Sequence, residues 1–252
     1  MVNYFAEKTW VELSKFIEAG TPVILPVGTT EEHGRHLPVG TDAMIAKGYA
    51  DMLAEECERQ GTHVLVMDTI RYGFSMSIVR RWPGCPNIGT RTFADYIFDI
   101  ADSLIQMGFK KIVMLDCHGN HDCLLRMVMR EIADKHGVYM MTLAPMSLSL
   151  DTYNKMKKDP EGDIHGGEWE TSCILYLHPE LVNKSEYTSV DAIRCNSRLR
   201  GPVSTWGLQE TKTGLFGDPA EATAELGEAV LKAAAVKGAE YIGEFVKHDP
   251  AK

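Results

Sequence analysis

Short apolar segments alternate with longer amphipathic segments along the chain. Four short, mostly apolar runs predict buried strands at 23–27, 63–67, 111–115 and 138–143. Amphipathic stretches predict helices at 41–59, 91–107 and 122–135. In the second of these, Phe93, Ile97 and Leu104 repeat at helical spacing, and Gly108 is a typical helix stop. Alternating strands and helices are typical of βαβ units, so we predict an α/β fold with a mainly parallel sheet and helices on both faces.

The later part of the chain carries a weaker pattern. Residues 155–167 are rich in charge and glycine, which predicts a long surface loop. Residues 219–245 are rich in alanine and glutamate, which predicts a closing helix. The chain shows no internal repeat, low-complexity run or linker, so we expect residues 1–252 to form a single domain.

Composition narrows the class of protein. Hydrophobic residues make up 44% and charged residues 24%, as in ordinary globular chains, and the net charge of −9 argues against nucleic acid as a partner. No apolar run approaches the roughly 20 residues that span a membrane, and the chain start resembles no signal peptide. The six cysteines form no CxxC pair and are expected to be reduced, so we predict a cytoplasmic protein.

Polar residues directly after the first predicted strand form a candidate metal site. This segment contains Glu31, Glu32, His33, His36 and Asp42. It lies at the carboxyl end of the strand, where the sites of parallel sheets are found, and in an extended segment Glu31 and His33 point to the same side. Carboxylates with imidazoles suit Zn²⁺, Mn²⁺ or Fe²⁺, and a shared carboxylate can hold two ions. The simpler alternative is an Asp helix cap with solvated His and Glu neighbours.

A second polar cluster, residues 116–122, follows the predicted 111–115 strand. His118 is therefore expected to project into the same crevice. The alternative is a helix N-cap at Asn120 or Asp122 with histidines on the surface.

A third cluster spans residues 163–172. His165 precedes two glycines, as expected where the backbone approaches a ligand closely. Glu170 begins a helical pattern, and the helix dipole favours a carboxylate there with or without a metal.

Together the three clusters resemble the creatininase (creatinine amidohydrolase) family. The matching segments are Glu31-Glu32-His33-Gly34 with His36-Leu37-Pro38 and Thr41-Asp42, then Asp116-Cys117-His118-Gly119-Asn120, then His165-Gly166-Gly167-Glu168-Trp169-Glu170-Thr171-Ser172. Weaker matches are Trp82-Pro83-Gly84 and Gly217-Asp218-Pro219 with Ala222-Thr223 and Glu225. The resemblance covers nearly the whole chain in the right order. It implies a three-layer α/β/α sandwich with a mainly parallel central sheet and a two-metal hydrolase site.

The resemblance also implies metal ligands. By position, Glu31 and His118 would hold one divalent ion, His33 would hold the other, and Asp42 would bridge them. The ions would be Zn, Mn or Fe, because carboxylates and imidazoles accommodate all three.

One position departs from creatininase itself. Creatininase has a glutamate two residues after the histidine that matches His118, and here that position is Asn120. Glu170 is then the expected substitute ligand on the second ion. The departure weakens the expectation that creatinine is the substrate.

The predicted mechanism is attack by metal-activated water on a carbonyl carbon. His165 matches a histidine proposed to act in substrate binding or proton transfer, and it is the expected catalytic proton donor, with Glu170 or Glu32 as alternatives. Expected substrate contacts are Trp169, Trp82, His36 and Trp206, of which each Trp has core packing as its alternative.

We therefore predict a hydrolase that cleaves a non-peptide C–N (amide) bond in a small, cyclic substrate, as creatinine amidohydrolases do. The alternative is hydrolytic C–C cleavage of a cyclic ketone, because the family includes a hydrolase that opens cyclic diketo-inositols. It also includes a formamide hydrolase and a mycofactocin peptidase. Creatininase forms hexamers, so the resemblance implies a homo-oligomer.

Two other classes remain as alternatives. A metal-free binding protein on the same fold is disfavoured because Glu31, Asp42 and His118 are all present. A cysteine-nucleophile enzyme would use Cys117 with His118 or His121 and would be insensitive to chelators.

Overall fold

A four-stranded parallel sheet forms the centre of the molecule. The computed structural model describes residues 2–160, 165–188 and 210–248. The strands are β1 (Val23–Val27), β2 (Leu65–Val66), β3 (Ile112–Asp116) and β4 (Met141–Leu143), in the order β2-β1-β3-β4. Every neighbouring pair is parallel, so the predicted α/β fold with a mainly parallel sheet is confirmed.

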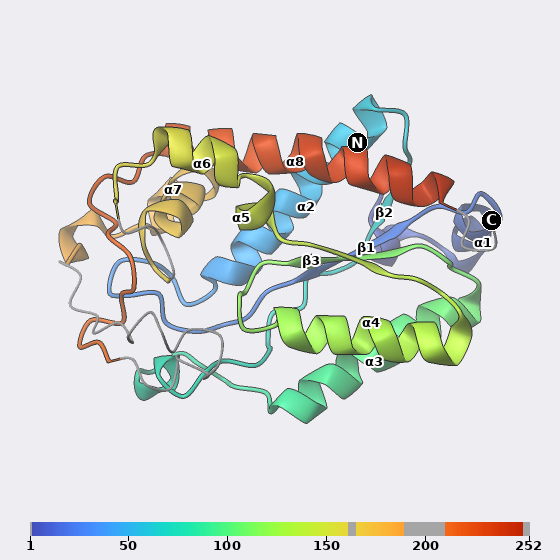
Figure 1. Ribbon diagram of the computed structural model, residues 1–252, viewed down its shortest axis with the longest axis horizontal. Helices are drawn as coiled ribbons and strands as arrows, with labels where there is room; N and C mark the ends of the chain where they lie inside the picture. Colours follow the sequence, from blue (N-terminus) through green and yellow to red (C-terminus); the bar gives the residue numbers. More distant parts are fainter. Residues whose placement is uncertain (1, 161–164, 189–209, 249–252) are drawn as a thin grey trace.

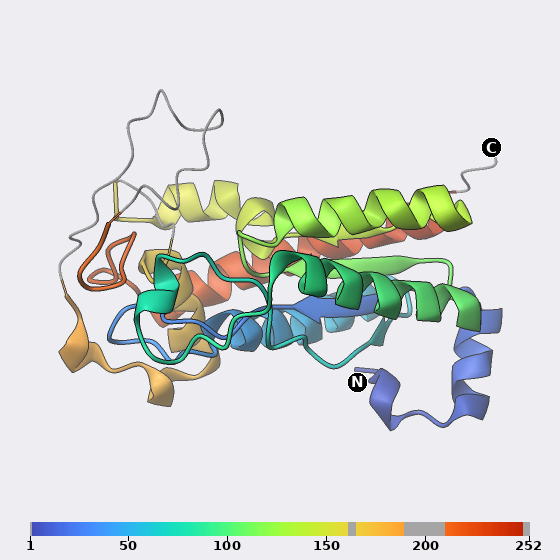
Figure 2. The same cartoon turned by 90° about the horizontal axis from the view of Figure 1, so that it is seen from below.

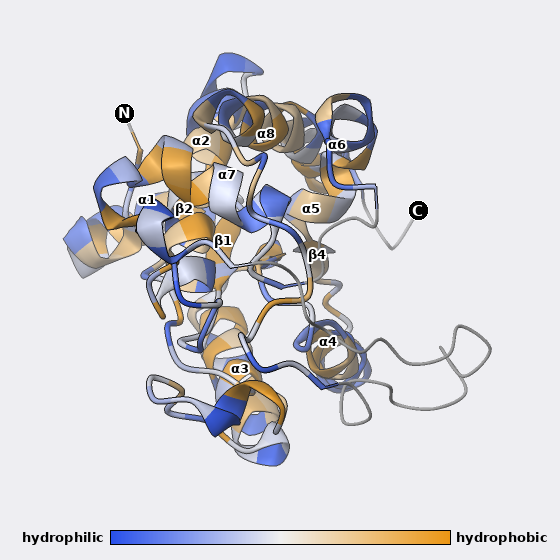
Figure 3. Cartoon of the chain, turned by 90° about the vertical axis from the view of Figure 1, so that its left-hand side faces the viewer, coloured by the Kyte–Doolittle hydropathy of each residue, from blue (hydrophilic) through white to orange (hydrophobic). Residues whose placement is uncertain are grey.

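Helices cover both faces of this sheet, which gives three layers (Figure 1). The helices are α1 (Trp10–Glu18), α2 (Thr41–Arg59), α3 (Thr90–Met107), α4 (Asp122–His136), α5 (Pro145–Leu148), α6 (Leu150–Met156), α7 (Glu168–Leu177) and α8 (Ala224–Lys247). Short 3-10 turns lie at Phe5–Glu7, Val79–Arg81, Pro179–Leu181 and Lys184–Glu186. Helices α3 and α4 lie side by side on one face (Figure 2), and α2 and α8 cover the other (Figure 3).

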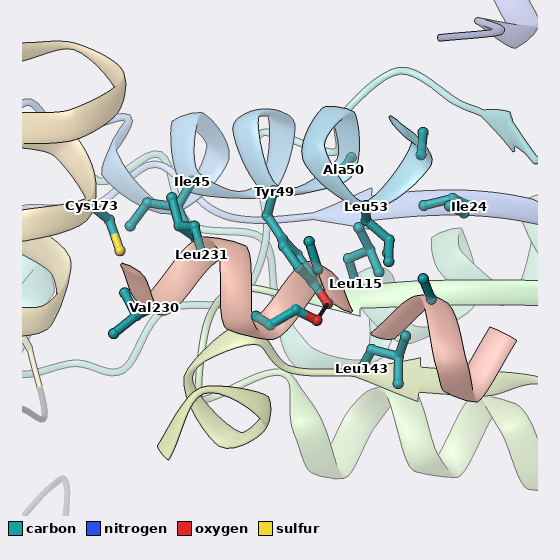
Figure 4. Packing of buried hydrophobic residues seen from close by; sticks show 14 of the residues in the cluster. Ile24, Ile45, Tyr49, Ala50, Leu53, Leu115, Leu143, Cys173, Val230 and Leu231 are labelled. Carbon is teal, nitrogen blue, oxygen red and sulfur yellow. Dashed lines mark hydrogen bonds between the residues drawn. The ribbon is translucent and has the colours of Figure 1, made fainter. Parts of the chain in front are cut away.

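Alternating side chains of the strands build one core on each face. Ile24 of β1 and Leu115 of β3 pack with α2, α7 and α8, whereas Leu25 and Met114 pack with α3 and α4. Tyr49 crosses the first core, where its hydroxyl donates to the carbonyl of Ala234 at 3.2 Å (Figure 4). Among the described residues, no helix combines the length and apolar character needed to cross a membrane.

The predicted elements match the structure with small shifts at their ends. The 41–59 helix is observed without change, and the 219–245 helix begins at Ala224, where Thr223 caps it by accepting from the N–H of Leu226. The predicted surface loop at 155–167 is wrong in part. Its first two residues end α6, residues 161–164 lie outside the described part, and His165 to Gly167 are buried.

Glu168 explains why this loop is drawn inward. Its buried carboxylate accepts the N–H groups of Lys158 at 2.9 Å and Asp159 at 3.0 Å, which holds the loop against the start of α7. Helices α1, α5 and α6 were not predicted. Helix α1 contains no fully buried residue, although its apolar residues do follow a helical period.

The register of β1 and β3 positions the candidate site. Val27 pairs with Asp116, so these two strands end at the same level of the sheet. The chain moves from β1 outward to β2 and then returns to β3 on the other side of β1, which makes the β1–β3 edge a topological switch point. Ligand sites of open α/β sheets form at such points, beyond the carboxyl ends of the strands.

Candidate metal centre

Asp42 lies between two histidines that come from different segments. Its Oδ1 is 3.0 Å from Nε2 of His33, and its Oδ2 is 2.9 Å from Nδ1 of His118. The residue is 1% exposed. Gly40 occupies the N-cap position of α2 without a side-chain cap, so Asp42 is not the helix cap of the simpler alternative. Its two oxygens instead face two imidazoles.

Gly28 allows the start of α2 to approach the end of β1. A Cβ at Gly28 would stand 2.6 Å from the backbone nitrogen of Ala43 and 2.7 Å from the carbonyl carbon of Asp42. A side chain there would overlap backbone atoms, which cannot rotate away. The absence of a side chain at Gly28 therefore brings Asp42 to the carboxyl edge of the sheet.

Glu31 lies near His118 as well and near a third histidine, His165. Its Oε1 is 3.5 Å from Nδ1 of His118 and 3.5 Å from Nδ1 of His165. Its Oε2 is buried and has no hydrogen-bond partner among the described residues. Burial of an unpaired carboxylate oxygen is costly, so this atom is suited to a ligand that the protein itself does not supply.

Glu170 approaches the cluster from the first turn of α7. Its Oε2 is 3.8 Å from Nε2 of His33 and accepts the N–H of Gly166 at 2.5 Å. Asn120 stands at the position where the sequence departs from creatininase. Its Nδ2 is 3.3 Å from Nε2 of His118, the ring nitrogen that does not face Asp42.

Within the described part of the chain, three sets of donor atoms are close enough to hold cations. They are Glu31, Asp42 and His118; His33, Asp42 and Glu170; and Glu31, His33 and His165, with the atoms of each set within 4.8 Å of one another. The first two sets share Asp42 through different oxygens. Buried carboxylates with imidazoles, one oxygen being unpartnered, fit divalent ions such as Zn²⁺ or Mn²⁺.

The carboxylates create a strongly negative local field. Burial alone would lower the pKa of His33 and His118. The charges of Asp42 and Glu170 outweigh this and raise the pKa of His33 well above its ordinary value, while Glu31 and Asp42 raise the pKa of His118 to about 9. For Asp42, burial is outweighed by the two histidines, which hold its pKa well below the usual range. The field that favours imidazolium also favours a bound cation.

His165 lies over His33 with ring centroids 4.3 Å apart. Its Nε2 is 2.6 Å from the carbonyl oxygen of Glu32, and its own carbonyl accepts the N–H of Phe216 at 2.9 Å. Burial opposes protonation, and His33 opposes it further, but Glu32 and Glu31 raise the pKa of His165 overall.

The predicted substrate contacts occupy different environments. His36 is buried, bonds Thr171 through Nε2 at 2.8 Å and has its pKa lowered to about 4 by burial and by His33. Trp169 is 4% exposed, packs in the core with α2 and α8, and donates to Ser149 at 3.3 Å, which favours the core-packing alternative. Trp82 is half-buried in the loop next to Val39, and Trp206 lies outside the described residues.

His121 and Asp116 complete the site in ways that the sequence did not indicate. His121 is fully buried, stacks on Phe93 at 4.2 Å and meets the edge of His118 at 4.6 Å, so the alternative of surface histidines is wrong. Burial raises the pKa of Asp116 to about 7, and its Oδ1 accepts the N–H of His118 at 3.3 Å. The signals in the sequence were the position of both residues after the predicted 111–115 strand and, for Asp116, its place in a segment that resembles creatininase.

The described cysteines are free thiols: Cys57, Cys85, Cys117, Cys123 and Cys173. Cys195 lies outside the described residues. Burial, with the charges of Asp116 and Asp42, raises the pKa of Cys117 well above its ordinary value. This disfavours the thiolate that a cysteine nucleophile requires.

Buried carboxylates and imidazoles at the carboxyl edge of a parallel α/β sheet are a donor set that a metal-dependent hydrolase can use. The family model for creatininase, described as creatinine amidohydrolase, matches residues 6–242, and the chain belongs to this family. A Bacteroides fragilis chain classed with the creatinine amidohydrolases has the same fold, with a TM-score of 0.84 and 28% identity over 99% of this chain and 98% of that chain. A mutant creatininase of the Zn-Zn type, at 22% identity, shares the fold with a TM-score of 0.80 over 98% of this chain and 100% of that chain.

The curated relatives differ in what they act on. Creatinine amidohydrolase of Pseudomonas putida is 28% identical over 196 residues, covering 71% of this chain and 74% of that protein. The 3-dehydro-scyllo-inosose hydrolase of Thermotoga maritima is 26% identical over 191 residues, covering 72% of this chain and 58% of that protein. Mycofactocin precursor peptide peptidase of Mycolicibacterium smegmatis is 28% identical over 214 residues, covering 83% of this chain and 79% of that protein.

Proposed function

We propose that the chain is a hydrolase with two divalent ions, Zn²⁺, Mn²⁺ or Fe²⁺, that share Asp42. Glu31 and His118 complete the first donor set, and His33 and Glu170 complete the second. The observation that carries this proposal is that the two oxygens of Asp42 face different histidines at 3.0 and 2.9 Å. Solved creatininases of this fold that are named for manganese and zinc support the choice of ions.

Bound ions would supply a nucleophile at neutral pH by lowering the pKa of a water molecule, and would polarise a carbonyl group. The protein's own residues perform the remaining tasks. His165 moves a proton between the nucleophile and the leaving group through Nδ1, which faces Glu31 at 3.5 Å. Leu215 is fully buried and lies against Gly34 and Gly166, where it limits access of bulk water.

The proposed reaction is cleavage of a non-peptide C–N bond in a small, cyclic amide. The family description and the relative from P. putida support it. The relative from T. maritima supports the second candidate, hydrolytic C–C cleavage of a cyclic ketone. The homo-oligomer and the cytoplasmic location stay predictions.

Metal content tests the proposal directly. Protein purified without chelator is expected to carry about two divalent ions per chain, as a two-metal site requires. Asp42→Ala should lose both ions. The metal-loaded enzyme is then incubated with creatinine, formamides and cyclic ketones, and C–N or C–C cleavage is followed by mass spectrometry. Wild-type protein that stays metal-free when Zn²⁺, Mn²⁺ and Fe²⁺ are supplied would overturn the proposal.

A further inference from the structure

The carboxylate of Glu32 is buried beside the metal ligands but belongs to none of the three donor sets. The residue is 5% exposed. Its Oε2 accepts the N–H of Gly34 at 2.8 Å. Its Oε1 has no hydrogen-bond partner among the described residues and lies 3.5 Å from Nε2 of His165.

His165 also contacts the main chain of Glu32. Its Nε2 is 2.6 Å from the main-chain carbonyl oxygen of Glu32. A carbonyl oxygen only accepts, so Nε2 carries the proton and donates it. The other nitrogen, Nδ1, is then unprotonated in the neutral ring, and it is the atom that faces Glu31 at 3.5 Å.

The surrounding backbone leaves Glu32 little freedom. A Cβ on Gly214 would stand 2.0 Å from Oε2 of Glu32, so the loop backbone closes over the carboxylate. The same loop holds His165, because the N–H of Phe216 donates to the His165 carbonyl at 2.9 Å. Ring and carboxylate are therefore fixed relative to each other from both sides.

We propose that Glu32 is a positioning residue, which holds His165 with Nε2 protonated and Nδ1 directed at Glu31 and the metal donor sets. The tautomer is a property of the chain itself, while its consequence for catalysis rests on the proposed function. The main-chain carbonyl of Glu32 accepts the N–H of His165, while the carboxylate accepts the N–H of Gly34 through Oε2 and leaves the negative Oε1 3.5 Å from Nε2. A glutamine keeps one acceptor oxygen for Gly34 and turns a donor toward Nε2, which opposes a proton on that nitrogen.

The test is the tautomer of His165 in protein labelled with ¹⁵N-histidine. Long-range ¹H–¹⁵N spectra distinguish a protonated Nε2 from a protonated Nδ1, and loss of signals in His165→Asn assigns the ring. Wild-type protein is expected to show the Nε2–H form. In Glu32→Gln the Nδ1–H form or exchange broadening should appear. Glu168→Gln is the matched control, because Glu168 is equally buried and binds only backbone N–H groups elsewhere.

Spectra are recorded with and without Zn²⁺ and need no turnover, so they remain interpretable if the two-metal proposal fails. An Nδ1–H form in wild-type protein, or an unchanged His165 in Glu32→Gln, would overturn the inference. The wild-type result stands even if the variant does not fold. If creatinine is turned over, Glu32→Gln should lower kcat about tenfold with KM unchanged. This is less than the ~10²–10⁴-fold loss expected for a missing proton-transfer group, because the main-chain acceptor for His165 remains. In a His165→Asn background the same change should have no effect.

Discussion

Gly214 lies so close to Glu32 that the two residues exclude any side chain at the glycine. A Cβ there would overlap Oε2 of Glu32 at 2.0 Å, and the backbone of Gly214 has a φ of +83°. The loop over the candidate site thus depends on a glycine for two separate reasons, conformation and contact. Gly61 has the same φ of +83° but nothing within 4 Å of its Cβ position.

The first prediction separates these two reasons. Gly61→Ala should cost about 1–2 kcal/mol of unfolding free energy, the strain of a left-handed alanine. Gly214→Ala should cost a further ~1–3 kcal/mol, because overlap forces side chains and backbone to shift. Urea unfolding of both variants measures the difference. Equal losses of unfolding free energy in the two variants would show that the carboxylate of Glu32 moves aside without an energetic cost.

The second prediction concerns the two acidic residues at the start of α7. Glu170→Gln should reduce bound metal from about two ions to about one, because only the donor set with His33 loses a ligand. Glu168→Gln should leave the metal content unchanged, since Glu168 accepts the N–H groups of Lys158 and Asp159 instead.

Elemental analysis of the two purified variants decides the point. The control is matched in chemistry, since both residues are acids in the first turn of the same helix. Full metal content in Glu170→Gln would remove Glu170 from the ligand set, and the remaining donor set for a second ion would be Glu31, His33 and His165.

The third prediction is that metal removal lowers thermal stability. An ion that binds only the folded state stabilises it by about 2.7 kcal/mol when free metal is 100 times Kd. Chelation should therefore lower the Tm of the wild type and leave Asp42→Ala unaffected. Asp51→Ala, on the same helix but paired with Lys47 at the surface, should keep the full chelator response. A chelator response retained in Asp42→Ala would contradict the shared carboxylate.

Much of the architecture was predictable because strand and helix periodicities are local properties. The 23–27 strand and the 41–59 helix were observed as predicted. Polar residues at adjacent strand ends were expected to converge, because carboxyl ends of parallel strands meet at one edge. The structure does bring His33 and His118 to the two oxygens of one carboxylate, that of Asp42.

The rest depends on contacts between residues far apart in sequence. No local pattern shows that Glu168 draws the 155–167 loop inward, or that Gly214 closes over Glu32. Helix α1 is a different case, because its signals are local. Thr9 begins a capping box, and Leu13, Phe16 and Ile17 repeat at helical spacing, so the sequence alone was enough to predict this helix.

The last prediction concerns stability at low pH, away from the site. Lys135 and His136 hydrogen-bond the carboxylate of Asp102 and lower its pKa from 3.8 to about 2. A carboxylate whose pKa is lower in the folded state stabilises the protein above the unfolded pKa and loses this contribution as pH falls through the folded pKa. Asp102→Asn should therefore lower the urea midpoint at neutral pH. Its difference from wild type should shrink between about pH 4 and about pH 2, where wild-type Asp102 itself becomes protonated. Asp95→Asn, an exposed position on the same helix, is the control and should change the midpoint little at any pH. A difference for Asp102→Asn that stays constant with pH would show that the loss comes from packing and not from the charge.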